Sequence, residues 1–150
     1  MASTVSSNNN VNGCGSGGGD PEKEFFGNVD CPAVTGFHAP IRTDDVFKLL
    51  GRNRGVQGHQ NSCYLDATLF AMFSFTSIFD CLLYRPANTH DIPEYTEVQK
   101  VLREEIVNPL RKNHFVRADK VMKLRQFLDS LTSVKGLMSE EKGTWTGGKM

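Results

Sequence analysis

The clearest hydrophobic pattern in the chain begins at Cys63 and continues for about a dozen residues. Apolar residues follow it at intervals of four, one, two, one and two positions, namely Leu65, Leu69, Phe70, Met72, Phe73 and Phe75. These intervals predict a helix that is buried on most of its sides. Asn61 and Ser62 precede it and are both favourable N-cap residues, and Asp66 places a carboxylate in the first turn.

Three more helical patterns follow. Residues 77–84 extend or follow the first helix and end before Pro86; a second helix runs from about Tyr95 to Asn108, where Pro109 limits it; a third spans about Ala118 to Leu131. Their core faces are formed by Ile78, Phe79, Leu82, Leu83, Val98, Leu102, Ile106, Val121, Leu124, Leu128 and Leu131, while Lys120, Lys123 and Arg125 take polar positions.

The rest of the chain is less regular. Residues 46–50 form a short helix or strand, and residues 52–54 read as a solvated basic turn. Ser, Asn and Gly dominate residues 1–24, which predicts a disordered tail with almost nothing to bury. Residues 143–150 contain the single Trp and show no helical period, so we expect a divergent C-terminal tail. The folded part is therefore expected between residues 25 and 142.

Composition narrows the class of protein. With 150 residues and 39% apolar content, the chain can form one small domain. Its 17 basic and 17 acidic residues give no basic footprint for nucleic acid. No apolar run approaches the ~18 residues of a membrane span. The N-terminal stretch has neither a signal-peptide nor a transit-peptide pattern, so we expect a cytoplasmic protein without nucleic-acid or membrane partners.

The four cysteines are Cys14, Cys31, Cys63 and Cys81. None of them shows C-x-x-C spacing, and the histidines complete no zinc pattern, so no metal and no cofactor is expected. Without a secretory signal, we interpret them as reduced thiols rather than as a disulfide framework.

Cys63 is the candidate for chemistry, because a polar loop containing Gly58 runs into it just where the helical pattern starts. Unpaired backbone N–H groups and the positive end of the helix dipole at such a position favour a thiolate. The same N–H groups can hold an oxyanion. The open alternative is a structural cysteine that packs at a helix end and is inert, because a lone cysteine needs a histidine partner to act as a nucleophile.

The run from Gln57 to Asp66, Gln-Gly-His-Gln-Asn-Ser-Cys-Tyr-Leu-Asp, resembles the cysteine box of the ubiquitin-specific proteases. In that family Asn-Ser-Cys-Tyr or Asn-Thr-Cys-Tyr opens the nucleophile helix. The similarity is greatest to the cylindromatosis-type deubiquitinases and continues through Leu83, Arg85, Pro86, residues 105–111 and residues 122–125. It covers about two thirds of the chain. The resemblance implies an α+β papain-like cysteine peptidase, of which residues 25–142 form mainly the helical thumb lobe.

The resemblance also implies a reaction. The box cysteine, here Cys63, attacks the carbonyl of ubiquitin's C-terminal glycine, while a downstream His acts as base and an Asp or Asn orients it. Many members carry an oxyanion-hole Asn five residues before the cysteine, where this chain has Gly58. The side-chain amide of Gln57 or the backbone N–H of Cys63 can substitute for that donor. The alternative for Gln57 is that it merely structures the loop.

No histidine of this chain matches the family's base, which lies far downstream of the cysteine. We expect His90 and His114 to be solvated and assign no role to His38 or His59. The expectation is a deubiquitinase truncated before its catalytic His and inactive alone, with apolar helix faces left uncovered. The partners implied are ubiquitin and polyubiquitin, with linear or signalling-type lysine-linked chains. Two alternatives stay open: a non-catalytic, ubiquitin- or scaffold-binding short isoform, and a helical structural protein with an inert cysteine.

Overall fold

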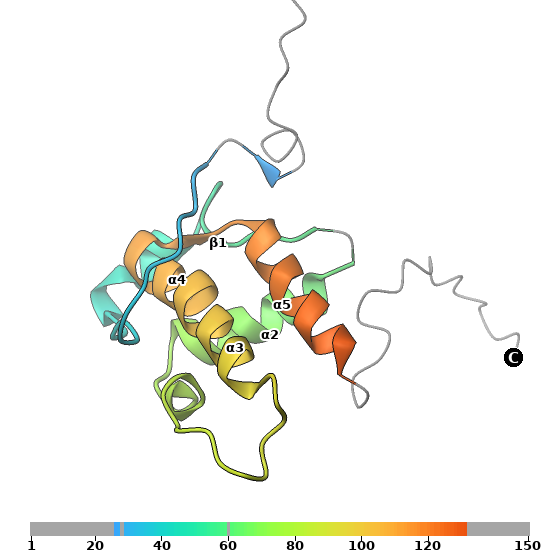
Figure 1. Cartoon of the computed structure of the whole chain (residues 1–150). Coiled ribbons are helices and arrows are strands. Elements are labelled where there is room, and N and C mark those ends of the chain that lie inside the picture. The colour runs from blue at the N-terminus through green and yellow to red at the C-terminus, as the bar shows by residue number, and fades with distance from the viewer. Residues whose placement is uncertain (1–25, 28, 60, 132–150) are drawn as a thin grey trace, which may run out of the picture.

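A computed structural model describes residues 26, 27, 29–59 and 61–131 (Figure 1). Its elements along the chain are η1 (Thr43–Leu49), β1 (Gly55–Val56), α2 (Cys63–Ser74), η2 (Asp80–Leu83), α3 (Tyr95–Lys100), η3 (Val101–Val107), α4 (Asn108–Asn113), β2 (Phe115–Val116) and α5 (Ala118–Ser130). Here η1 and η2 are 3₁₀ helices and η3 is a π-helix. The described part is thus mostly helical, and the predicted tails at 1–24 and 143–150 lie outside it.

α3, η3 and α4 follow one another without a break, so the expectation that Pro109 ends the second helix is wrong. Pro109 lies in the first turn of α4. A proline inside an α-helix lacks an N–H and presses on the carbonyl four residues back. Here the preceding turns are π-helical, and Asn108 donates its N–H to the carbonyl of Arg103, five residues back. We attribute the passage of the helix through Pro109 to these wider turns.

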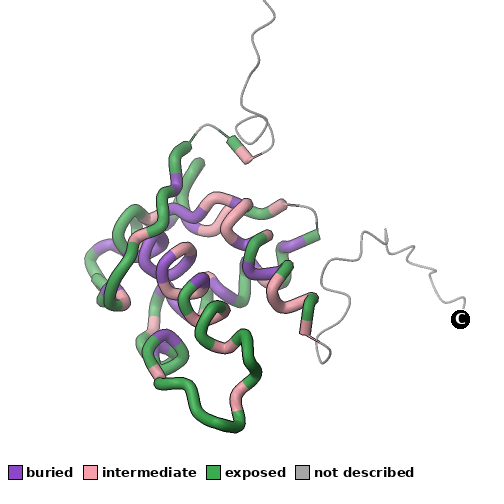
Figure 2. Tube along the Cα trace, viewed as in Figure 1, coloured by how far each residue is buried: buried purple, intermediate pink, exposed green. Residues whose placement is uncertain are grey.

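α2 begins at Cys63 as predicted, but the prediction that it is buried on most sides is wrong. Its buried residues are Asp66, Leu69, Phe73 and Ser74. The other face exposes Cys63, Tyr64, Ala67, Thr68 and Ala71, and the exposed Phe75 follows directly after the helix. Ile78, Leu82 and Tyr84, which follow it in the chain, are also exposed. Figure 2 shows how exposed and buried stretches alternate along the trace. The predicted apolar positions of α2 from Leu65 to Phe73 lie in the core or pack against it, but no described residue covers the opposite face.

The core lies between α2, the helical run of α3, η3 and α4, and α5. Its fully buried members include Phe73, Leu83, Ile106, Val107, Leu110 and Val116. α5 confirms the third predicted helix, with Val121 and Leu124 in the core and Leu128 packed against it. Arg125 was expected at a polar position, yet it is buried, because its side chain turns toward the loop before Cys63.

Two segments differ in detail from the pattern. Residues 46–50, predicted as helix or strand, belong mainly to the 3₁₀ helix η1, and of residues 77–84 only the part from Asp80 to Leu83 is helical. The solvated turn at residues 52–54 is confirmed, because all three residues are exposed.

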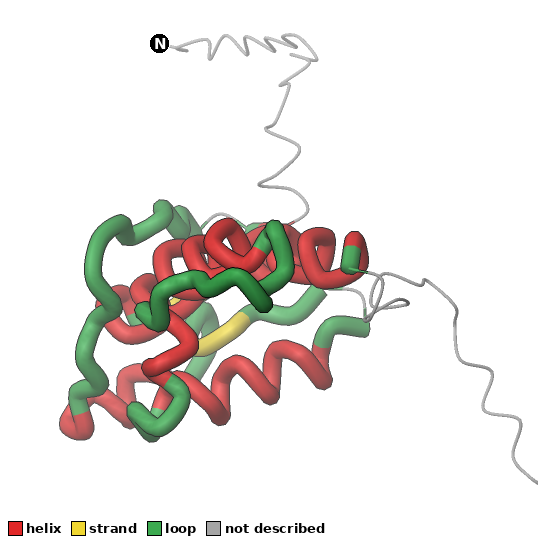
Figure 3. The backbone as a smooth tube through the Cα atoms, turned by 60° about the horizontal axis from the view of Figure 1, so that its bottom comes forward, coloured by secondary structure: helices red, strands yellow, loops and turns green. Residues whose placement is uncertain are grey.

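A parallel strand pair fixes the chain that leads to α2. Gly55 pairs with Phe115 and Val56 with Val116. The Gln57 N–H extends the pairing by donating to the Val116 carbonyl at 2.9 Å. Figure 3 shows these short strands among the helices. The pairing therefore attaches the start of the pre-cysteine loop to the connection between α4 and α5.

Candidate active site

Cys63 is the first residue of α2, and its side chain is exposed and free. Ser62 precedes it as the N-cap residue, as the sequence predicts, but the Ser62 hydroxyl caps no N–H of the first turn. Asn61 lies before the cap with a φ of 48°, in the left-handed region that asparagine tolerates. The thiol is therefore exposed to solvent at the N-terminus of the helix, which is the position expected for a nucleophile.

The first turn of α2 also holds a buried carboxylate, that of Asp66. Asp66 Oδ2 accepts the hydroxyl of Ser62 at 2.5 Å, and Ser62 Oγ accepts the backbone N–H of His59 at 2.9 Å. Burial raises the pKa of Asp66 above its usual 3.8, while the bond from Ser62 and the charge of Arg125 act in the opposite direction. Asp66 Oδ1 is also buried and has no hydrogen-bond partner among the residues that the structure describes.

Gln57 lies in the loop between β1 and α2. Its side-chain Nε2 donates to the carbonyl of Arg54 at 2.7 Å. One of the two amide hydrogens is therefore used within the loop, which agrees with the loop-structuring alternative and leaves the second hydrogen for another acceptor. The oxyanion role of Gln57 stays a prediction.

The four histidines occupy different environments. His59 packs edge-on against Phe26, with ring centroids 5.1 Å apart. His38 lies 3.7 Å from a carboxylate oxygen of Asp80, and His90 is exposed as predicted. The prediction that His114 is solvated is wrong, because its side chain is only 14% exposed.

The reason is a carboxylate distant in sequence. His114 Nε2 lies 3.3 Å from Oδ2 of Asp45, which belongs to η1.

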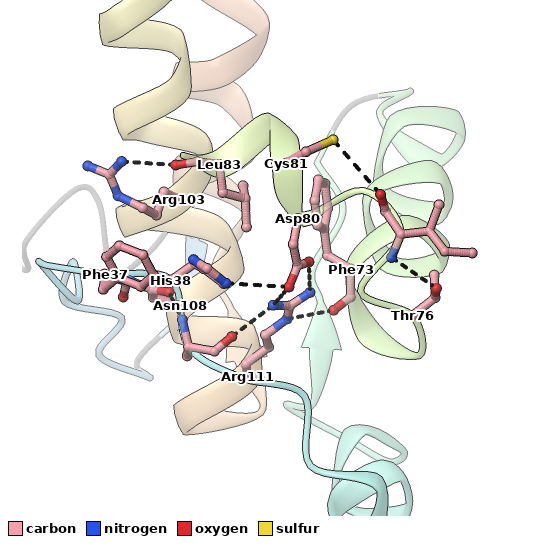
Figure 4. A network of polar contacts seen from close by, with 12 residues as sticks. Phe37, His38, Phe73, Thr76, Asp80, Cys81, Leu83, Arg103, Asn108 and Arg111 are labelled. Carbon is pink, nitrogen blue, oxygen red and sulfur yellow. Dashed lines mark hydrogen bonds and ion pairs between the residues drawn. The ribbon is translucent and has the colours of Figure 1, made fainter. Parts of the chain in front are cut away.

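A buried network anchors the far end of α2 (Figure 4). Arg111 donates to both carboxylate oxygens of Asp80, at 2.6 and 3.0 Å, and to the carbonyls of Phe73 and Ala39 at 2.9 and 2.8 Å. Phe73 lies in the last turn of α2. A guanidinium provides five N–H donors in a planar fork, which suits a carboxylate and two carbonyls at once. Arg111 thereby ties α2 to α4 and to η2.

Open space borders the loop before the thiol. One groove of about 260 Å³ is lined by Leu49, Arg54, Gly55, Val56, Asp66, Ala67 and Phe70. A second, of about 370 Å³, is lined by residues that include Gln57, Gly58, Phe26 and Phe115. Among the described residues there is no cluster of three or more His, Cys, Asp or Glu side chains able to hold a metal ion. Within the same part of the chain no helix is long and apolar enough to cross a bilayer.

Similarity to known proteins indicates what kind of protein carries this exposed thiol at a helix start. No family model matches the chain. A stretch of 94 residues is 50% identical to the human and bovine proteins named ubiquitin carboxyl-terminal hydrolase CYLD, and 51% identical to the mouse protein of that name. The chain carries a CYLD-like ubiquitin-specific protease region. This stretch is 63% of the chain but about a tenth of the length of each of those relatives.

The CYLD-like region implies a papain-like fold at the level of the family, and the mostly helical described part is compatible with a portion of it. Sequence reasoning found the thiol and its helix. It did not predict that Asp66 is buried and accepts the Ser62 hydroxyl, nor that Arg125 is buried against the His59 carbonyl. For Asp66 a signal was available: a hydroxyl four residues before it, and a glycine at position 58.

Proposed function

We propose that the chain supplies the nucleophile-bearing, helical thumb lobe of a cysteine-type deubiquitinase. Cys63 Sγ attacks the carbonyl carbon of ubiquitin's C-terminal glycine and forms a thioester, the amine leaves with a proton, and water hydrolyses the thioester. The observation that carries the proposal is an exposed Cys63 at the first position of α2, within a region half identical to proteins named ubiquitin carboxyl-terminal hydrolase.

The oxyanion formed in each step needs N–H donors near the sulfur. The backbone N–H of Cys63 itself is well placed by its position at the helix start, and the remaining amide hydrogen of Gln57 is the second candidate. Gly58 offers no side-chain donor.

We further propose that this chain alone turns over ubiquitin conjugates poorly. His38 lies beside Asp80 and His114 beside Asp45, on carboxylates that belong to η2 and η1 rather than to α2. No described histidine is assigned as the base. Members of a catalytic triad act as a unit, so a thiol without its base retains little of the rate advantage.

The proposed partners are ubiquitin and polyubiquitin, with linear or signalling-type lysine-linked chains. The proposed location is the cytoplasm, with which the free thiols of Cys31, Cys63 and Cys81 are compatible.

The test is covalent capture by ubiquitin that carries an electrophile in place of its C-terminal carboxylate. We expect an adduct on Cys63 in the full chain and its loss in Cys63→Ser. Cys81→Ser is the matched control, since Cys81 is also exposed and free. Equal labelling of Cys63 and Cys81 would show a merely accessible thiol and contradict the proposal.

Turnover of ubiquitin with a fluorogenic C-terminal amide then separates the remaining possibilities. Adduct formation with little turnover is the expected pair of results. Tight ubiquitin binding without an adduct would instead favour the non-catalytic binding protein. Neither binding nor an adduct would favour a helical structural protein with an inert cysteine.

A further inference from the structure

Position 58 combines two unusual features. It is a glycine whose backbone is not in the left-handed region, so its φ does not require a glycine. A Cβ at this position would nevertheless lie 2.8 Å from Oδ2 of Asp66 and 3.5 Å from Oγ of Ser62. Cβ atoms in proteins essentially never come within 3.0 Å of such an atom, so one of the two would have to shift. Glycine is present here for space, and the atom that fills the space is the Asp66 carboxylate.

The carboxylate has little freedom to move away. Asp66 is 7% exposed, and its Oδ2 is the acceptor that holds the Ser62 hydroxyl at 2.5 Å. Ser62 Oγ in turn holds the His59 N–H at 2.9 Å. Rotating the carboxylate out of reach of a new Cβ would break the first of these bonds and release the second. A single buried acid therefore holds Ser62 directly and the His59 N–H through Ser62, while it fills the space beside Gly58.

A second contact holds the same loop from α5. The buried Arg125 directs Nη1 at the carbonyl of His59 at 3.4 Å, and its charge acts on the buried Asp66. His59 thus has its N–H fixed through Ser62 to α2 and its carbonyl directed toward α5.

We propose that Asp66 is a positioning residue for the nucleophile and that it requires glycine at position 58. Asp66 sets the positions of Gly58, His59 and Ser62 ahead of α2, and these positions determine where the backbone N–H groups at the start of α2 point. In this chain an Asn at position 58 would displace the Asp66 carboxylate rather than supply an extra oxyanion donor. The catalytic consequence rests on the proposed function; the coupling of the two residues does not.

The direct readout is hydrogen exchange of the His59 amide, followed by NMR in the full chain. The Gly55 N–H is the internal reference, because it donates to the His114 carbonyl at 2.9 Å and reports opening of the strand pair instead. Gly58→Ala should lower the protection of His59 relative to Gly55 by about tenfold or more, the scale of one lost buried hydrogen bond.

The companion variants separate positioning from general stability. Asp66→Ala should lower His59 protection similarly, and adding Gly58→Ala to it should cost little more, because the clash is gone. Asp66→Asn keeps an acceptor oxygen for Ser62 and should stay within about threefold of the wild type. Asp44→Ala removes an exposed first-turn acid from η1 and should change nothing.

Independent, additive losses from the Gly58 and Asp66 substitutions would overturn the proposal, as would full His59 protection in Gly58→Ala. If Asp66→Ala unfolds, Gly55 exchange rises as well, and Gly58→Ala with Asp66→Asn decides the question. Capture by the ubiquitin electrophile is measured in parallel, and Gly58→Asn should slow it. Intact coupling in the exchange data with no capture in the wild type would refute the deubiquitinase function alone.

Discussion

Replacing Arg111 by methionine is the most direct test of how α2 is held in place. Arg111 is 3% exposed at its side chain and makes four hydrogen bonds: two to Asp80, one to Phe73 and one to Ala39. Methionine has a similar length but donates nothing. The variant therefore leaves a buried carboxylate and two carbonyls without their donor.

The size of the effect follows from which partner is lost. Removing one member of a buried ion pair costs about 3–5 kcal/mol, because the other charge stays buried and uncompensated. That is a large part of the roughly 5–15 kcal/mol that stabilises an ordinary domain. With a urea slope of about 1–3 kcal/mol per molar, the midpoint of unfolding should fall by roughly 1–5 M.

The assay is urea unfolding of the full chain, followed by circular dichroism and by the NMR signals of methyl groups in the core. Arg42→Met is the matched control. The Arg42 side chain is 70% exposed, and its partner Asp45, 3.1 Å away, keeps Lys48 at 2.8 Å when Arg42 is replaced, so the midpoint should move far less than in Arg111→Met. Replacing both Arg111 and Asp80 by apolar residues should recover much of the loss. Equal midpoints for Arg111→Met and Arg42→Met would refute the reasoning.

Four further outcomes are expected. Because burial raises the folded-state pKa of Asp66 above 3.8, the stability that protonated Asp66 contributes at low pH is lost as the pH rises through that raised value. The urea midpoint of the wild type should therefore fall relative to that of Asp66→Asn as the pH is raised from below 3.8. Burial likewise raises the pKa of the Cys31 thiol, so alkylation mapped by mass spectrometry at pH 8 should be slower at Cys31 than at the exposed Cys81. Asn108→Ala should cost at least about 1–3 kcal/mol by urea unfolding, since its fully buried amide satisfies three backbone groups of residues 34–39. Ubiquitin titrated calorimetrically into the full chain should bind no more tightly than about −5 kcal/mol, a high-micromolar dissociation constant, and nanomolar binding would favour the non-catalytic reading.

The parts of the fold that the sequence could predict are those that depend on near neighbours. The start of α2 at Cys63 follows from a polar loop meeting an apolar period, and α5 from the regular spacing of Val121 and Leu124. The exposed thiol at a helix start could likewise be predicted from its local setting. Each of these features is determined by residues that lie close together in the sequence.

The features that sequence reasoning missed depend on partners far along the chain. The His114 side chain is mostly covered because Asp45 lies against it, and Arg125 turns inward toward a loop 66 residues earlier. The helix continues past Pro109 because the turns before it change their hydrogen-bond spacing, for which residue propensities give no signal. The apolar period of α2 could not show which face remains uncovered, since that depends on what packs there.

The attachment of residues 34–39 to Asn108 and Arg111 has a consequence for synthesis on the ribosome. The Arg111 bond to the Ala39 carbonyl spans 72 residues, and the strand pair that precedes α2 also waits for Phe115 and Val116. At roughly 5–20 residues per second, the ribosome needs about 4–14 s to make that intervening stretch. The Phe73 carbonyl, near the end of α2, lies 38 residues before Arg111, so for roughly the last 2–8 s of this interval α2 has neither its anchor nor the β2 partner of the strand that precedes it. The nascent chain thus presents Cys63 and a largely apolar segment to chaperones before either can dock, and the thiol is accessible to oxidants earlier than the fold that is to orient it.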